Sequence, residues 1–296
     1  ARAFTIFSDF YNGVASMQPK LSYTVRGLEP DTSYHVEVSG IESFGKEGVP
    51  IASDRFTTAS ALLIDAGFAD GTPKDSGPYA TAYAYHGGPA AEEAAELGQK
   101  ALRFDRDKEQ YVSLGMNDEQ LSGLENGFTL ELIFRLDNLD KAQEVIGNGQ
   151  FAGLYLEVNT DGRAEFAVYS DQEDRYITAD TQVEAGKWYH YVAVYDGAQI
   201  LTFLDGRVTG RASMTGKVRL NRAVKMTLGA DPNEGDKIDG YFLSGSIAKV
   251  RLDGYGMSEA GASRRFADWE AGRTGKDAAV ILGLDLRDGA VRDTSV

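Results

Sequence analysis

The 296-residue chain contains no cysteine, which excludes disulfide bridges, thiolate metal sites and cysteine nucleophiles. Histidine is almost as scarce, because the sequence holds only His35, His86 and His190, and they lie far apart. None of them has a second histidine or a carboxylate at ligand spacing, so a transition-metal site is not supported. His35 and His190 fall within strand patterns and are expected to pack, whereas His86 follows several tyrosines and is a candidate for lining a groove.

Long apolar runs are also missing. None approaches the ~20 residues that a helix needs to span a bilayer, so membrane insertion is not expected. Lysine and arginine number 30 against 45 aspartates and glutamates, and the formal net charge of −15 argues against nucleic acid and anionic membranes as partners. The sequence begins at Ala1 with neither an initiator methionine nor a signal peptide, so we expect it to be part of a longer protein whose targeting signals lie elsewhere.

The composition that is present, with 34 glycines, 7 prolines and 42% hydrophobic residues, is typical of an ordered and turn-rich protein. Its clearest pattern lies in residues 186–210. Residues 188–195 alternate between two faces, and the pairs Asp196-Gly197 and Asp205-Gly206 enclose a second strand. Because Asp-Gly favours the positive φ angles of tight hairpins, this stretch predicts an antiparallel meander. Strands at this density, bounded by turns, predict an all-β sandwich.

Several further elements are expected from the same kind of pattern. Residues 128–134 place a hydrophobic side chain at every second position, and residues 248–252 do the same with Ala248 on the core face. Ser258 is the predicted N-cap of a short helix. The residues from 87 to 98, rich in Gly, Ala and Glu, are expected to form a loop or a short exposed helix.

The order of motifs in residues 186–210 resembles the laminin-G-like, concanavalin A-like jelly-roll domains. These domains carry a tryptophan, a nearby histidine, a hydrophobic strand, a Tyr-Asp-Gly turn and an Asp-Gly hairpin, as this chain does from Trp188 to Gly206. Residues 101–114 resemble the ALxFDG…YVxV hairpin of that family, with Arg106 where glycine is usual. The resemblance implies an antiparallel β-sandwich over residues 60–280 that ends in a short helix.

Residues 1–59 are predicted to form a separate first unit. The segment Gly27–Tyr34, with the sequence GLEPDTSY, resembles the corner of fibronectin type III domains, where the tyrosine hydroxyl bonds to upstream backbone. The unit is shorter than the ~100 residues of a complete sandwich of this kind, so the resemblance implies a partial domain. We interpret this unit as a spacer without a ligand of its own.

Residues 281–296 leave two interpretations open. They repeat the pattern near residues 68–76, since Gly289 lies 218 positions after Gly71 and Asp293 lies 218 positions after Asp75. The segment is either the first strand of a second laminin-G-like repeat, which we favour, or a closing strand of the preceding domain whose similarity arose by chance.

A catalytic set is not evident. Retaining glucanases of the sandwich fold carry two carboxylates on one strand, ~5 to 5.5 Å apart. Here Glu29 and Asp31 lie in a predicted turn, and the adjacent Glu173 and Asp174 would point to opposite sides of a strand. A G-x-S-x-G nucleophile elbow is missing as well. We therefore assign no catalytic residue and predict that this stretch of protein is not itself an enzyme.

Calcium is the cation that the sequence favours, because hard cations take several oxygens from carboxylates, amides and carbonyls of a folded loop. The first candidate group lies in the loop of residues 229–236, which resembles the place where calcium-binding members of the wider superfamily hold their ions: Asp231, Asn233, Glu234 and Asp236. The second group lies near the start of the domain: Asp65, Asp70 and Asp75. Neither group follows a strict spacing rule, so an ordinary acidic surface loop is the alternative.

Exposed tyrosines are the candidate platform for a ligand, because sugar rings pack on flat aromatic faces while polar groups fix their hydroxyls. The candidates come from the strands and from the loop of residues 170–175: Tyr83, Tyr85, His86, Tyr155, Tyr169, Tyr176, Asp174 and Arg175. Aromatic residues on strands also pack in cores, and Trp188 and Trp269 are assigned there.

With these residues, the family resemblance implies a carbohydrate-binding or adhesion region, supported by calcium, of a larger secreted or cell-surface bacterial enzyme. Glycoside hydrolases and calcineurin-like phosphoesterases commonly carry such regions. The expected partners are a glycan or another cell-surface ligand and the neighbouring domains of the parent chain. Two alternatives stay open: a structural spacer that positions a catalytic domain, and a sandwich-fold hydrolase or lyase with an unrecognised site.

Overall fold

The computed structural model describes residues 28–30, 32–35, 37–38, 51–52, 55–68, 74–149, 151–172, 177–271, 284–285 and 292–293. The chain divides into two compact units, of which one comprises residues 61–274 and the other residues 1–60 together with 275–296. The calcium candidate Asp70 lies outside the described residues.

The smaller unit contains the corner that its sequence predicts. The hydroxyl of Tyr34 accepts a hydrogen bond from the backbone N–H of Glu29 at 2.9 Å, which confirms that one contact. Three short antiparallel pairs are described: β1 (Ser33–Tyr34) with β4 (Phe56–Thr57), β2 (Glu37–Val38) with β3 (Ile51–Ala52), and β23 (Leu284–Asp285) with β24 (Arg292–Asp293). A fibronectin type III domain and a second laminin-G-like repeat both stay predictions.

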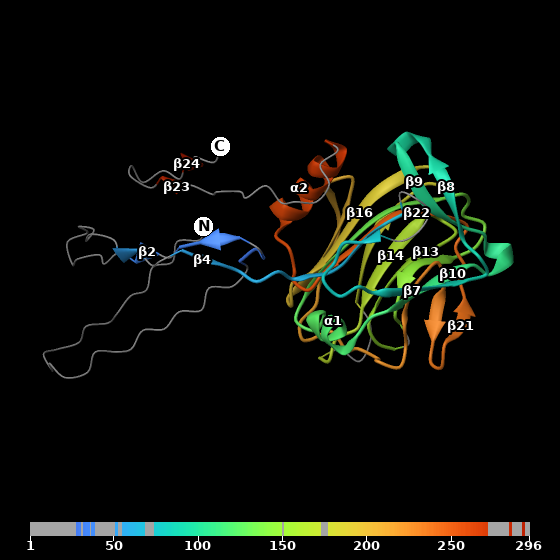
Figure 1. The fold of residues 1–296 in the computed structure, drawn as a ribbon, viewed down its shortest axis with the longest axis horizontal. Helices are drawn as coiled ribbons and strands as arrows, with labels where there is room; N and C mark the ends of the chain where they lie inside the picture. The colour runs from blue at the N-terminus through green and yellow to red at the C-terminus, as the bar shows by residue number, and fades with distance from the viewer. Residues whose placement is uncertain are drawn as a thin grey trace, which may run out of the picture. The chain divides into compact units, whose positions relative to one another are not determined.

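Two antiparallel sheets face each other in the described part of residues 61–274 (Figure 1). Sheet I has seven strands in the order β15-β14-β13-β12-β19-β10-β7. In that order its strands are Ile177–Gln182, Arg163–Val168, Leu154–Val158, Gln143–Gly147, Met226–Leu228, Tyr111–Gly115 and Ala82–His86.

Sheet II has nine described strands, in the order β18-β17-β16-β11-β22-β5-β6, with β9 pairing β22 and β8 pairing β9. Along the main order its strands are Arg207–Ser213, Gln199–Leu204, Trp188–Tyr195, Phe128–Leu136, Gly245–Asp253, Leu62–Gly67 and Lys74–Asp75. The two further strands are β8 (Ala90–Ala94) and β9 (Gln99–Phe104). Together the sheets form the antiparallel jelly-roll sandwich that the sequence predicts.

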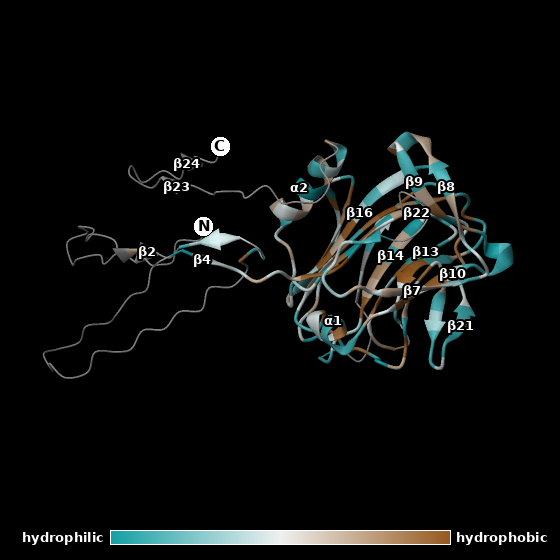
Figure 2. Cartoon of the chain, viewed as in Figure 1, coloured by the Kyte–Doolittle hydropathy of each residue, from teal (hydrophilic) through white to brown (hydrophobic). Residues whose placement is uncertain are grey.

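The hydrophobic core lies between the two sheets. Phe128, Leu130, Leu132 and Phe134 of β11 are fully buried there, which confirms the predicted core face of residues 128–134. Burial of each such side chain contributes about 1.5–3 kcal/mol. Figure 2 shows hydrophobic residues concentrated on the strands of the sandwich and hydrophilic ones on β21 (Lys237–Gly240) at its surface.

The central strand β16 has two hydrophobic faces, as its alternation predicts. Its tyrosines Tyr189, Tyr191 and Tyr195 join the core, whereas Val192 and Val194 pack on the other side with residues next to and within helix α2 (Glu259–Glu270). The turn between β17 and β18 has positive φ at both Asp205 (49°) and Gly206 (75°), as a two-residue hairpin requires. The Ser258 side chain accepts a hydrogen bond from the N–H of Gly261, so the predicted N-cap is confirmed.

Two predictions of local structure are wrong. Within residues 87–98, a short helix is present only at Ala95–Leu97. Residues 90–94 are instead a strand, β8, that pairs with β9, because Ala94 is buried in a small apolar cluster and Glu92 reaches Arg135 at 3.1 Å. Ala248 does not share the core face of Val250, because β22 has an irregularity opposite Ile133 and Phe134. The extra residue places Ala248 in the cluster beneath Trp188 and Trp269.

A buried network of charges joins α2 to sheet II. Glu131 is 2% exposed and accepts hydrogen bonds from His190 Nε2 (3.1 Å), Lys249 Nζ (3.1 Å) and Arg265 Nη1 (2.9 Å). Arg265, from α2, also lies 2.9 Å from Asp253. Burial alone would raise the pKa of Glu131, but the charges of Lys249 and Arg265 and the hydrogen bond from His190 hold it well below its usual range.

Of the residues assigned to packing, His190 is buried, and Trp188 and Trp269 are partly buried against a small cluster on sheet II. The assignment of His35 is wrong, because its side chain is exposed. The ring of His190 stacks on Trp269 with 5.3 Å between centroids, and Arg135 lies 5.1 Å from the ring centre of Trp188. The other described α-helix, α1 (Asp118–Gly123), has Asn117 as its N-cap in a capping box. No helix among the described residues is long and apolar enough to cross a membrane.

Candidate functional site

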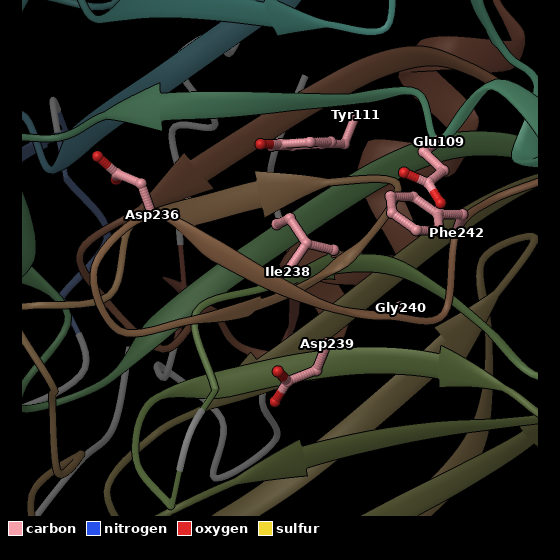
Figure 3. Close-up of a pocket in the computed structure, with 7 residues that line it drawn as sticks. All are labelled: Glu109, Tyr111, Asp236, Ile238, Asp239, Gly240 and Phe242. Carbon is pink, nitrogen blue, oxygen red and sulfur yellow. The ribbon is translucent and has the colours of Figure 1, made fainter.

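A hollow of about 450 Å³ lies on the outer face of sheet I, between β10 and the hairpin formed by β20 (Asp231–Asn233) and β21. Figure 3 shows the seven residues that line it: Glu109, Tyr111, Asp236, Ile238, Asp239, Gly240 and Phe242.

The aromatic wall of this hollow follows from the alternation of β10. Val112 and Leu114 are buried in the core, so Tyr111 and Ser113 face outward. His86 lies opposite Tyr111 on β7, and their rings stack with centroids 4.1 Å apart and planes 4° from parallel. The ring of Phe242 lies 6.4 Å from that of Tyr111. His86, Tyr111 and Phe242 therefore form one aromatic group. We use the name aromatic hollow for these three residues together with the other residues that line the hollow.

Carboxylates surround the aromatic rings. Figure 3 shows Glu109 beside Phe242 and Asp236 at the opposite end, while Asp239 points away from Tyr111 on the far side of the hairpin. Burial raises the pKa of Tyr111, and the charge of Asp236 raises it further, so the phenol stays protonated at neutral pH. The hollow thus combines flat ring faces with hydrogen-bond donors and acceptors, as a site for a small polar ring requires.

The structure brings some of the tyrosine candidates together and separates others. His86 joins Tyr111, and Tyr155 lies on the same outer face, where its hydroxyl donates to Glu165 at 3.1 Å. Tyr83 and Tyr85 pair with Leu114 and Val112 and so point toward the opposite face of sheet I. The expectation that they line a groove with His86 is corrected, because adjacent residues of a strand face opposite sides.

Tyr83 and Tyr169 have structural roles. The Tyr83 hydroxyl donates to Asp75 at 3.1 Å, and burial together with this carboxylate raises its pKa. Tyr169 is 8% exposed and packs beneath Arg219, whose guanidinium lies 5.6 Å from its ring centre. Three other candidates, Asp174, Arg175 and Tyr176, lie outside the described residues and stay predictions.

The side chains of the first calcium group point to different partners. Asp236 pairs with Lys225 at 2.8 Å, Glu234 accepts from Asn221 at 2.9 Å, and Asn233 donates to Asp239 at 2.8 Å. Among the described residues, no three histidine, aspartate or glutamate side chains converge closely enough to hold a metal ion. Calcium at this loop stays a prediction.

The second calcium group is a hydrogen-bonded turn. Asp75 Oδ1 accepts from the backbone N–H of Asp65 (3.0 Å) and of Gly77 (2.8 Å), and Asp65 Oδ2 accepts from Ser76 (3.0 Å). These contacts satisfy the carboxylates within the protein. Calcium binding stays a prediction that a chelator can test.

The sequence did not reveal one cluster of acidic residues on sheet I. Glu144 of β12 lies opposite Glu157 of β13 in the strand register, and Glu157 lies opposite Glu165 of β14. Such cross-strand partners have Cβ atoms about 4.5–5.5 Å apart. Asp231 of the hairpin lies near enough to Glu144 and Glu157 to raise the pKa of both. We call Glu144, Glu157, Glu165 and Asp231 the acidic row.

The acidic row contains perturbed carboxyl groups. Burial raises the pKa of Glu144 well above its usual range, and Asp231 and Glu157 add to the effect. Burial and the charge of Asp239 raise the pKa of Asp231 to about 6. Each of the three strands carries a single glutamate, so the row becomes visible only with the strand register.

The family model described as the concanavalin A-like lectin/glucanases superfamily matches residues 106–260. No curated protein matches the sequence.

Solved structures with the same fold include binding domains of toxins. The binding domain of botulinum neurotoxin DC in complex with SialylT has a TM-score of 0.57 and 10% identity, covering 76% of this chain and 54% of its own. The binding domain of Paraclostridial mosquitocidal protein 1 has a TM-score of 0.58 and 13% identity, covering 71% and 52%.

A third solved structure concerns botulinum neurotoxin type C, whose cell entry depends on interaction with two ganglioside molecules. Its TM-score is 0.57 at 10% identity, covering 71% of this chain and 51% of its own. The chain thus spans about half the length of the solved structures it matches. At such low identity the similarity concerns the fold.

Proposed function

Because the chain belongs to the concanavalin A-like lectin/glucanase superfamily, we propose that it is a non-catalytic binding domain that recognises a glycan on a cell surface. The observation that carries this proposal is the aromatic hollow, in which His86 stacks on Tyr111 beside Phe242. Its volume of about 450 Å³ is typical of pockets for small ligands.

The aromatic hollow offers what a sugar ring needs. The apolar face of a pyranose packs on the ring of Tyr111 or Phe242, while Glu109 and Asp236 accept hydrogen bonds from its hydroxyls. Toxin binding domains of the same fold support this proposal, since one is bound to SialylT and another depends on gangliosides for cell entry.

We place this domain in a larger secreted or surface-bound bacterial enzyme, such as a glycoside hydrolase or a calcineurin-like phosphoesterase. In that setting the unit of residues 1–59 is a spacer, and the neighbouring domains of the parent chain are its partners. The net charge of −15 supports a partner other than nucleic acid or an anionic membrane.

Tyr111→Ala is expected to weaken glycan binding by about tenfold to a hundredfold, because an aromatic residue at the centre of a contact carries much of its free energy. A glycan array run with calcium and with a chelator identifies the ligand, and titration calorimetry then measures its affinity. Loss of binding in the chelator would support calcium as well.

The matched control is Tyr85→Ala, because Tyr85 is 38% exposed but lies on the other side of sheet I. This control is expected to bind like the unmodified chain. Unchanged binding by Tyr111→Ala, or equal losses in both variants, would contradict the assignment of the aromatic hollow.

A further inference from the structure

Glu144 is a buried acid whose carboxyl group is only partly satisfied. The residue is 3% exposed, and its Oε1 has no hydrogen-bond partner among the described residues. It lies against Gly147, where an added Cβ would collide with Glu144 Oε1 and stand 3.0 Å from the Cβ of Tyr155. Gly147 thus leaves the space that the carboxyl group of Glu144 occupies beside Tyr155. Folded proteins rarely leave such a group without a partner.

The neighbours of Glu144 are acids. Glu157 and Asp231 act on it electrostatically, and neither they nor Glu144 form an ion pair with a lysine or arginine among the described residues. The nearby Arg163 pairs with Glu165 (3.2 Å) and with Asp180 (3.4 Å). Among the described residues, the middle of the acidic row therefore has no lysine or arginine in an ion pair with it. Burial favours the protonated form of Glu144, and the charge of Arg163 acts on Glu157.

We propose that the acidic row binds the protonated amine of a hexosamine, so that the ligand of this domain is a glycan with free amino groups. An ammonium group is a hydrogen-bond donor, and the partly exposed Glu157 and Asp231 are acceptors that it can reach beside the buried Glu144. Tyr155 lies beside them and offers its ring to the sugar and to the cation. This inference rests on the proposed function and names its ligand class.

Other ligand types fit the acidic row less well. An anionic sugar would be repelled by the uncompensated carboxylates, and a neutral sugar would leave their charge in place. A metal ion needs a convergent set of ligands that the described residues do not form. A basic peptide would supply amines, but the aromatic hollow on the same face of sheet I, with Tyr111 and Phe242, favours a ring-bearing ligand.

Titration calorimetry on the full chain tests the inference with three β-1,4-linked hexamers that differ at one position of each sugar: glucosamine, N-acetylglucosamine and glucose. Spermine serves as an amine without a sugar ring. We expect the glucosamine hexamer to bind at least tenfold more tightly than the other two hexamers and than spermine. In the double variant Glu144→Gln, Asp231→Asn this preference is expected to disappear. The control Glu259→Gln, an exposed acid at the start of α2, is expected to keep it.

The outcomes separate the inference from the proposed function. Equal binding of the three hexamers would overturn the inference and leave glycan recognition standing. The same holds for an array that identifies only glycans without amino groups. If the preference for the glucosamine hexamer survives in the double variant, the amine binds elsewhere and the inference is overturned. If spermine binds as tightly as the glucosamine hexamer, the sugar ring does not contribute to binding, and the inference is overturned as well. An array without any glycan ligand would overturn the inference together with the proposed function.

Discussion

Glu131→Ala is expected to lower the free energy of unfolding by about 3 to 5 kcal/mol, because it removes the shared partner of the buried His190 and Arg265 and of the partly buried Lys249. Lys249 and Arg265 would keep their charges, and His190 would lose the acceptor of its Nε2. For a domain of this size the loss corresponds to a fall of about 10 °C in the midpoint of thermal unfolding. Urea and thermal unfolding followed by circular dichroism measure both quantities.

The matched control is Glu259→Gln. Glu259 also pairs with an arginine, Arg211 at 2.7 Å, but both side chains are about half exposed. Water and salt screen such a pair, so the control is expected to lose less than about 1 kcal/mol. Similar losses in the two variants would show that burial of the Glu131 network does not matter for stability.

Asp231→Asn is expected to stabilise the protein at pH 7.5 by about 1 to 2 kcal/mol. In the folded chain the pKa of Asp231 is raised from 3.8 to about 6 by burial and by Asp239. A raised pKa means that the folded state binds more protons than the unfolded state between these two values, so stability falls as the pH rises through this window. A shift of about two units sets an upper limit near 3 kcal/mol, and partial exposure of Asp231 reduces it.

The pH dependence distinguishes this cause from any other gain. Urea unfolding at pH 7.5 is expected to favour the variant, while at pH 3.5 the unmodified Asp231 is mostly protonated in both states and the advantage should vanish. Asp118→Asn is the control, because the Asp118 side chain is 89% exposed in its pair with Arg222. An equal gain at both pH values, or a loss at pH 7.5, would contradict the assignment.

The same substitution is expected to weaken binding of an aminated ligand while it strengthens the fold. Charges that repel each other in the free protein are a common cost of a binding site, and their removal stabilises a protein at the expense of function. A variant that gains both stability and affinity would place the amine outside the acidic row.

Much of the fold could be predicted from local patterns. The Asp-Gly pairs at 196 and 205 and the alternation in β11 and β16 act over a few residues. The structure agrees with the alternation and with the pair at 205, whereas at 196 only Gly197 has a positive φ. The bulge in β22 could not be predicted, because it depends on how two strands far apart in the sequence fit together. It therefore reversed the side on which Ala248 lies.

The candidate site was predictable only in part, and for the same reason. His86 was identified next to Tyr83 and Tyr85, but its stacking partner Tyr111 comes from another strand. Neither Glu144 nor Glu157 stands out in the sequence, because each is the single acid of its strand. Their proximity results from the pairing of β12 with β13.

The distance between the aromatic hollow and the acidic row determines how long a ligand must be to contact both. Tyr111 lies on β10 and Tyr155 on β13, and the sheet order places β19 and β12 between them. Three spacings between neighbouring strands amount to roughly 14 Å. A single sugar can then touch one of the two regions but not both. A sugar oligomer long enough to reach across the β20–β21 hairpin makes the second contact while it is already bound at the first. The domain would therefore discriminate oligomers by their length as well as by their chemistry.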